Sequence, residues 1–123
     1  MEVVHLDDFN RIKCLDVFYD ELNKLFSKSI PEKKKYLKFL YAELHKIDNR
    51  KETIQREEPI NYKDITLYSI RKRAQKNTRV LYFYMENDNI ILLTAFDEKN
   101  KSDYDNANER AYRRLKNLEL IWL

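Results

Sequence analysis

Apolar residues recur every three or four positions through the first 50 residues, and this spacing predicts two amphipathic helices. The apolar face of the first helix consists of Leu15, Phe18, Leu22 and Leu25. Asp7 or Asp8 is expected to cap this helix, and its pattern fades near Ser27. The short segment before it, Val3–Leu6, does not decide between a strand and coil.

A capping box marks the start of the second helix. Ser29 and Glu32 have the S-x-x-E spacing, and Pro31 falls in the first turn, where proline is best tolerated. The helix is expected to run to about Asp48, with an apolar face made of Leu37, Leu40, Tyr41, Leu44 and Ile47. Its Lys33–Lys35 run has two interpretations, an anion-binding patch or a solvated helix face whose charge Glu32 partly offsets.

The middle of the chain changes from helical spacing to short apolar runs. Residues Asn49–Asp64 are polar, contain Pro59 and show no clear period, so we expect a connecting loop there. Three strands are predicted over Ile65–Arg73, Arg79–Met85 and Asn89–Phe96. Between the last two, Glu86–Asp88 predicts a tight turn, because Asn and Asp are best able to take a positive φ in a chain without glycine.

A third helix is predicted over Asp103–Leu118, where Glu109 and Arg113 form an i,i+4 pair. Its apolar face consists of Ala107, Ala111, Leu115 and Leu118. The expected fold is therefore α+β in one domain over residues 1–123, with two N-terminal helices, an antiparallel meander of three strands or four, and a C-terminal helix. The apolar tail Leu118–Leu123 either folds back on the core or a sheet edge, or contacts a partner, as in a homodimer.

Composition narrows the classes of function. The chain is 43% hydrophobic and 37% charged, as in soluble globular proteins, and its net charge of +3 leaves any basic signal to local clustering. It shows no membrane span or secretory signal, and its single cysteine, Cys14, fits a reducing cytoplasm. Without glycine it has no Walker A loop or dinucleotide fingerprint. Cys14, His5 and His45 lack zinc-ligand spacing, and we assign both histidines structural or surface roles, so no metal or cofactor is predicted.

Five cations lie close together without an intervening acid: Arg71, Lys72, Arg73, Lys76 and Arg79. If Tyr68 and Ile70 face the helices, strand alternation puts Ser69, Arg71 and Arg73 on the opposite face, next to Arg79 at the start of the following strand. Guanidinium groups gathered on an open face suit a phosphate ligand. Alternatively, they pair with Glu57, Glu58 or Glu98 on a solvated sheet face.

An ordered set of motifs resembles the RelE/ParE superfamily of bacterial type II toxins, in particular the HigB branch with its phage-encoded relatives. That branch has L-Y-x-L-R, R-V-F-Y-F and I-V-L-L-x-x-F strands followed by an A-x-x-R-L helix. The corresponding segments here are Leu67-Tyr68-Ser69-Ile70-Arg71, Arg79-Val80-Leu81-Tyr82-Phe83, Ile90-Ile91-Leu92-Leu93-Thr94-Ala95-Phe96 and Ala111-Tyr112-Arg113-Arg114-Leu115. They cover about 50 residues.

The resemblance implies a cytoplasmic mRNA interferase that cuts mRNA on the ribosome without a metal and is held inactive by an antitoxin, expected to be a helix-turn-helix protein. It implies that Arg79 holds the scissile phosphate and that Tyr104 and Lys99 are catalytic. The RNA-binding residues that it suggests are Arg71, Arg73, Lys76 and Lys101. The chain departs from the branch at Glu98 and Ser102, which stand where lysines are expected. The alternative is a non-enzymatic inhibitor on the same scaffold, which binds a host protein such as a topoisomerase, as the ParE branch does.

Overall fold

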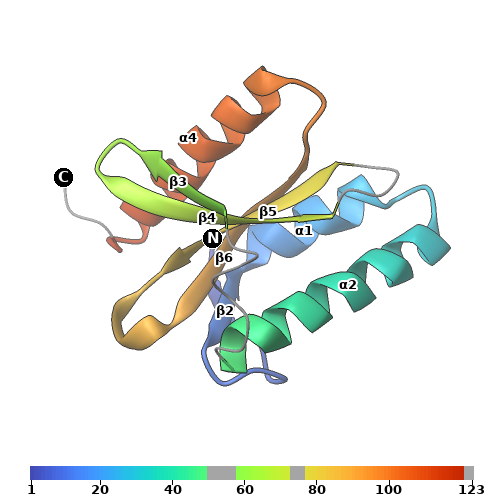
Figure 1. Ribbon diagram of the computed structural model, residues 1–123, viewed down its shortest axis with the longest axis horizontal. Coiled ribbons are helices and arrows are strands. Elements are labelled where there is room, and N and C mark those ends of the chain that lie inside the picture. Colours follow the sequence, from blue (N-terminus) through green and yellow to red (C-terminus); the bar gives the residue numbers. More distant parts are fainter. Residues whose placement is uncertain (50–57, 73–76, 121–123) are drawn as a thin grey trace.

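The computed structural model describes residues 1–49, 58–72 and 77–120, which form an α+β fold around one mixed sheet (Figure 1). Helices cover both faces of this sheet. In chain order, the described elements are β1 (Val3–His5), β2 (Ile12–Leu15), α1 (Asp16–Leu25), α2 (Ile30–Asn49), β3 (Glu58–Tyr62), β4 (Ile65–Lys72), β5 (Thr78–Tyr84), the short 3-10 helix η1 (Glu86–Asp88), β6 (Ile90–Asp97) and α4 (Lys101–Asn117).

The sheet corrects the expected fold class. It has six strands in the order β1-β2-β6-β5-β4-β3, where the sequence predicted an antiparallel meander of three or four. It is also mixed, because β2 runs parallel to β6 with Ile12 opposite Ile90. Two strands precede the helices, so the N-terminal half is not purely helical. The polar segment expected to be a loop contains β3, whose Pro59 lies on the sheet edge, where a missing N–H is tolerated.

The first helix starts later than predicted. Neither Asp7 nor Asp8 caps it; α1 begins at Asp16, and Leu15 is the N-cap residue. The helical spacing of Leu15 and Phe18 concealed the strand before it, in which Ile12, Cys14 and Leu15 are all buried. Pairing of β2 between β1 and β6 buries these side chains, and the free energy gained by this burial outweighs the local preference for a helix.

The second helix matches its capping box. The Ser29 hydroxyl accepts a hydrogen bond from the Glu32 backbone N–H (3.3 Å), and the helix runs to Asn49, one residue beyond the expected end. Near that end, the buried Asp48 carboxylate accepts the backbone N–H groups of Asn10 (3.0 Å) and Arg11 (2.8 Å). Arg11 in turn donates to the carbonyl oxygens of Ile47 and Asp48, both at 2.6 Å. This junction fixes the end of α2 to the segment that enters β2.

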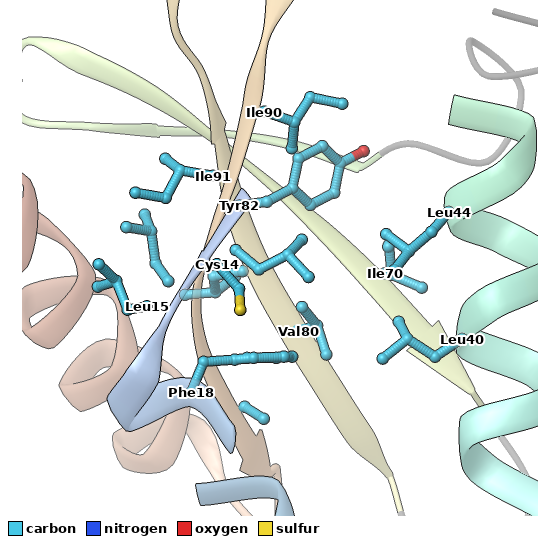
Figure 2. Close-up of a cluster of buried hydrophobic side chains, with 14 of the residues drawn as sticks. Cys14, Leu15, Phe18, Leu40, Leu44, Ile70, Val80, Tyr82, Ile90 and Ile91 are labelled. Atoms are coloured by element: carbon cyan, nitrogen blue, oxygen red, sulfur yellow. The ribbon is translucent and has the colours of Figure 1, made fainter. Parts of the chain in front are cut away.

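Apolar side chains fill both spaces between the sheet and its helices. In Figure 2, Leu40 and Leu44 of α2 point toward Ile70 and Tyr82 of the sheet, while Leu15 and Ile91 lie on the other side of the strands. On the second face, the small side chains Ala107 and Ala111 of α4 are fully buried, which lets the helix approach closely. Each fully buried leucine or isoleucine contributes roughly 1.5–3 kcal/mol, so the two-sided core is the main stabilising contribution.

Three chain reversals in the described residues contain left-handed residues other than glycine, and one of them is the β3–β4 turn, where Lys63 has φ of 53°. In the turn between β5 and β6, Asn87 and Asp88 both have φ of 60°, which confirms the prediction for this turn. After α4, Glu119 has φ of 57°, and the Leu120 N–H bonds to the Leu115 carbonyl (3.0 Å), as in a Schellman motif. Leu118 and Leu120 pack against the core, in agreement with the interpretation that the tail folds back; residues 121–123 lie outside the described part of the chain.

Candidate functional site

Arg71 and Arg79 lie directly opposite each other in the β4–β5 pair, as strand alternation predicted. The face that carries them is not open, however, because α4 covers it. The first turns of this helix bring the Tyr104 ring to 4.7 Å from the guanidinium carbon of Arg79, and Arg79 is only 5% exposed. The covering helix starts here because Asn100 and Asp103 form a capping box directly after β6.

Two carboxylates bind Arg79 in this covered position. Its Nε donates a hydrogen bond to Glu98, and its Nη1 donates to Glu58 Oε2 (2.9 Å) and to the Ser69 hydroxyl (3.4 Å). Arg71 lies on the other side of the same carboxylate, with Nη2 3.7 Å from Glu58 Oε1. The ion-pair interpretation is therefore confirmed for Glu58 and Glu98. We call this group the Arg79 cluster; it consists of Glu58, Ser69, Arg71, Arg79, Glu98 and Tyr104. Its two cations face two anions, so the cluster has no net charge at neutral pH.

The pKa shifts in the cluster reinforce the charged state of its ion pairs. Burial opposes the charge of Arg79, but its hydrogen bonds to Glu58 and Glu98 raise its pKa overall. Burial raises the pKa of Glu58, and the hydrogen bond and charge of Arg79 more than offset this effect, so its pKa falls below the ordinary value. Glu58 therefore remains ionised at neutral pH, and its carboxylate can accept hydrogen bonds and protons but cannot donate them.

Tyr104 is the aromatic border of the cluster. Burial raises its pKa, and the Ser69 hydroxyl and the Arg79 charge lower it by a smaller amount. The phenol therefore stays protonated at neutral pH, and it is suited to stacking and to donating a hydrogen bond, rather than to removing a proton. Its ring also packs edge-on against Phe96, with centroids 5.7 Å apart, which fixes its orientation over Arg79.

The predicted lysines follow Glu98 of the cluster along the chain. Lys99 and Lys101 are exposed on either side of the residue that caps α4, and neither has an ion pair within the described ranges. Lys99 lines a cavity with Glu21 and Lys24 of α1, and its backbone N–H donates to Asp103 Oδ2 (2.9 Å), so acids lie beside it. Arg73 and Lys76, which the sequence also assigned to RNA binding, lie outside the described residues, as does Glu57.

Sequence reasoning missed Glu58 as a member of the site. The residue was placed in a loop, whereas it begins β3 and lies opposite Ser69 in the β3–β4 pair. The alternation of Glu58, Ile60 and Tyr62 is the signal that could have revealed this short strand. Tyr62 of the same face reaches α4 through a hydrogen bond to Glu109, so this face of β3 is directed toward the covering helix.

Two further properties concern possible ligands and membranes. Among the residues that the structure describes, no group of three or more His, Cys, Asp or Glu side chains is arranged to hold a metal ion. Within the same residues, every helix is too short or too polar to cross a lipid bilayer.

Comparison with known families identifies the chain. The family model described as Phage derived protein Gp49-like (DUF891) matches residues 21–116, from within α1 to the last turn of α4. Comparisons with curated proteins and with solved structures found no match. The family match does not single out the HigB branch, so that finer assignment stays a prediction. The chain belongs to the Gp49-like family of phage-derived proteins, whose members are typically toxins of toxin–antitoxin systems with RelE-like character.

Proposed function

We propose that this protein is a toxin that acts as an endoribonuclease on translated mRNA at the ribosome and is neutralised by a cognate antitoxin, expected to be a helix-turn-helix protein. Membership of the Gp49-like family supports the toxin class and the antitoxin partner. The Arg79 cluster supports the choice of RNA as substrate, because it combines phosphate-binding groups with a proton acceptor.

The observation that carries the proposal is the position of Glu58 between two arginines. Its carboxylate lies 2.9 Å from Arg79 Nη1 and 3.7 Å from Arg71 Nη2, and its side chain is 47% exposed. RNA supplies its own nucleophile, the 2′-hydroxyl, so cleavage needs a base to remove one proton and cations to stabilise the charge on phosphorus. An exposed, ionised carboxylate flanked by guanidinium groups provides both.

In the proposed reaction, Glu58 removes the proton from the 2′-hydroxyl, whose oxygen attacks the adjacent phosphorus. The bond from phosphorus to the 5′-oxygen breaks, and the products are a 2′,3′-cyclic phosphate and a 5′-hydroxyl end. The ammonium of Lys99, the residue after Glu98, donates the proton that the leaving oxygen requires. Arg71, the more exposed arginine, binds the phosphate and stabilises the developing charge, while Arg79 holds Glu58 in position. Protonated Tyr104 stacks on Arg79 and keeps the guanidinium oriented.

The test is expression of the protein in bacteria, with growth and transcript integrity followed together, and cleavage of a defined RNA by the purified protein. Wild type is expected to arrest growth and to deplete transcripts. Glu58→Gln keeps the shape of the side chain but cannot accept the proton, so cleavage should fall by about 10²–10⁴-fold. Glu86→Gln in the exposed η1 turn is the matched control and should behave as wild type. Transcripts that stay intact in arrested wild-type cells would contradict the proposal.

The second candidate is non-enzymatic inhibition of a host protein, such as a topoisomerase. The neutralisation of Arg79 by Glu98 as well as Glu58 favours it, since an added acid weakens phosphate binding. This candidate predicts growth arrest with intact RNA, unchanged by Glu58→Gln, and stable capture of the purified topoisomerase by the purified toxin.

A further inference from the structure

A second basic surface lies on α4, on the side of the helix that faces the start of α1. Three arginines and one carboxylate of α4 line a cavity of about 520 Å³ here, together with two asparagines of α4, Val17 of α1 and Met1; the charged residues are Glu109, Arg110, Arg113 and Arg114. A cavity of this size accommodates a nucleotide unit. The Arg79 cluster contributes no residue to it, so the cavity is a separate site.

Two of these arginines are held in a geometry suited to phosphate. Arg110 Nε donates to the Thr94 hydroxyl (3.0 Å), and Arg113 Nε donates to Glu109 Oε1 (3.3 Å). Within the described part of the chain, the terminal Nη groups of Arg110 and Arg113 have no hydrogen-bond partner. A guanidinium fixed through Nε presents its two Nη groups as a fork, which matches two oxygens of one phosphate. The Arg110 and Arg113 side chains are 33% and 74% exposed, so an incoming ligand can reach both.

The carboxylate nearest to Arg110 is largely engaged elsewhere. Glu21 of α1 binds Arg114 through both oxygens, with Oε1 2.8 Å from Nη1 and Oε2 3.2 Å from Nη2. Its Oε2 is also 3.2 Å from Arg110 Nε, so one carboxylate serves two guanidinium groups. Burial lowers the pKa of Arg110, and the neighbouring Arg114 charge lowers it further, although Glu21 acts in the opposite direction.

The carboxylate beside Arg113 is shared in the same way. Glu109 accepts a hydrogen bond from the Tyr62 hydroxyl and is 3.2 Å from the Lys63 ammonium, in addition to its contact with Arg113. Glu21 and Glu109 are therefore each shared between two cations, and among the side chains that line the cavity three arginines face one carboxylate. Unlike the Arg79 cluster, the cavity keeps an excess of positive charge, which attracts an anion.

We propose that this cavity binds a phosphate group in the backbone of single-stranded RNA through Arg110 and Arg113. The choice of RNA rests on the proposed function. Both sites lie along one helix: nine residues separate Tyr104 at the Arg79 cluster from Arg113, and a rise of about 1.5 Å per residue places them about 14 Å apart along the axis. Nine residues are also about two and a half helical turns, so the two sites lie on opposite sides of α4. An RNA strand that crosses over α4 would contact the cavity with one phosphate while another lies at the Arg79 cluster.

The test measures affinity of the purified full-length protein for a fluorescent 2′-O-methyl RNA, which binds but cannot be cleaved because its nucleophile is blocked. The double variant Arg110→Gln/Arg113→Gln is expected to lose affinity on the order of ten-fold and to reduce the slope of log K against log salt by about 1–2. Arg113→Gln alone changes a mostly exposed side chain, keeps the fold, and should lose about three-fold. Lys28→Gln/Lys38→Gln, at exposed positions before and within α2, removes the same charge elsewhere and should change affinity by less than about two-fold.

If both arginine variants bind this RNA as the lysine control does, the proposal is overturned. It is also overturned if RNA affinity is unchanged while binding of an acidic peptide weakens, because the cavity would then serve a protein partner. The two proposals fail separately: wild type that binds the methylated RNA through Arg113 but leaves unmodified RNA intact would remove the nuclease and keep the cavity. If the arginine variants cleave RNA normally and their salt slope equals that of wild type, the cavity proposal is removed and the nuclease proposal is kept.

Discussion

The junction between Asp48 and Arg11 gives a stability prediction whose size follows from the structure. Asp48 is only 8% exposed, and its two carboxylate oxygens accept separate backbone N–H groups, those of Asn10 and Arg11. In Asp48→Asn, one of these N–H groups loses its acceptor and meets an amide NH2. A buried donor without a partner costs about 1–3 kcal/mol, and hydrogen bonds to a charged acceptor are worth about 1.5–3 kcal/mol. The expected loss of unfolding free energy is therefore about 2–4 kcal/mol.

A loss of this size is a large part of the roughly 5–15 kcal/mol that stabilises a typical domain. It corresponds to a fall in Tm of roughly 6–15 °C for a chain of this length. Urea and thermal unfolding, followed by circular dichroism, measure both quantities. Asp105→Asn on the exposed side of α4 is the matched control and should stay within about 0.5 kcal/mol of wild type. If Asp48→Asn is as stable as this control, the junction does not hold α2 in the manner described.

Two further predictions concern backbone strain and a buried thiol. Glu119→Gly should raise the unfolding free energy by about 0.5–1 kcal/mol in urea titrations, because Glu119 has a left-handed φ of 57° that glycine adopts without strain. The control Lys116→Gly, in the last turn of α4, should instead lower the unfolding free energy by up to about 1 kcal/mol. If Glu119→Gly destabilises the protein, residue 119 does not have the left-handed conformation described. Burial raises the pKa of Cys14 from 9.0 to about 11, so iodoacetamide at pH 8 should alkylate the native protein at least about 100-fold more slowly than the urea-unfolded protein, as followed by mass spectrometry. Equal rates in the two states would show that the thiol is accessible.

Local signals predicted the parts of the fold that depend on neighbouring residues. The α2 start at Ser29 rests on a side-chain hydrogen bond three residues away, and the β5–β6 turn rests on the ability of Asn87 and Asp88 to take a positive φ. Three of the strands were visible as runs of β-branched and aromatic residues. These features need no knowledge of distant partners.

The parts that were missed depend on contacts distant in sequence. The strand at Ile12–Leu15 is stabilised by parallel pairing with β6, and its apolar residues fit a helical period equally well. The face predicted to be open is covered, because the apolar side of α4 packs on it and brings Tyr104 over Arg79. The role of Glu58 depends on the β3–β4 register, which puts its carboxylate between arginines 13 and 21 residues further along the chain. Charge pattern alone does not define such a site.

The parallel β2–β6 pair also constrains how the protein is made. The partners Ile12 and Ile90 are separated by most of the chain, and closing so long a loop is an unfavourable and slow step in folding. During translation, β2 can pair with β1 as soon as both are made, but its other partner, β6, is absent until residue 90 and its neighbours have left the exit tunnel. The β2–β6 pair therefore assembles only near the end of synthesis, and until then Ile12, Cys14 and Leu15 stay accessible to chaperones.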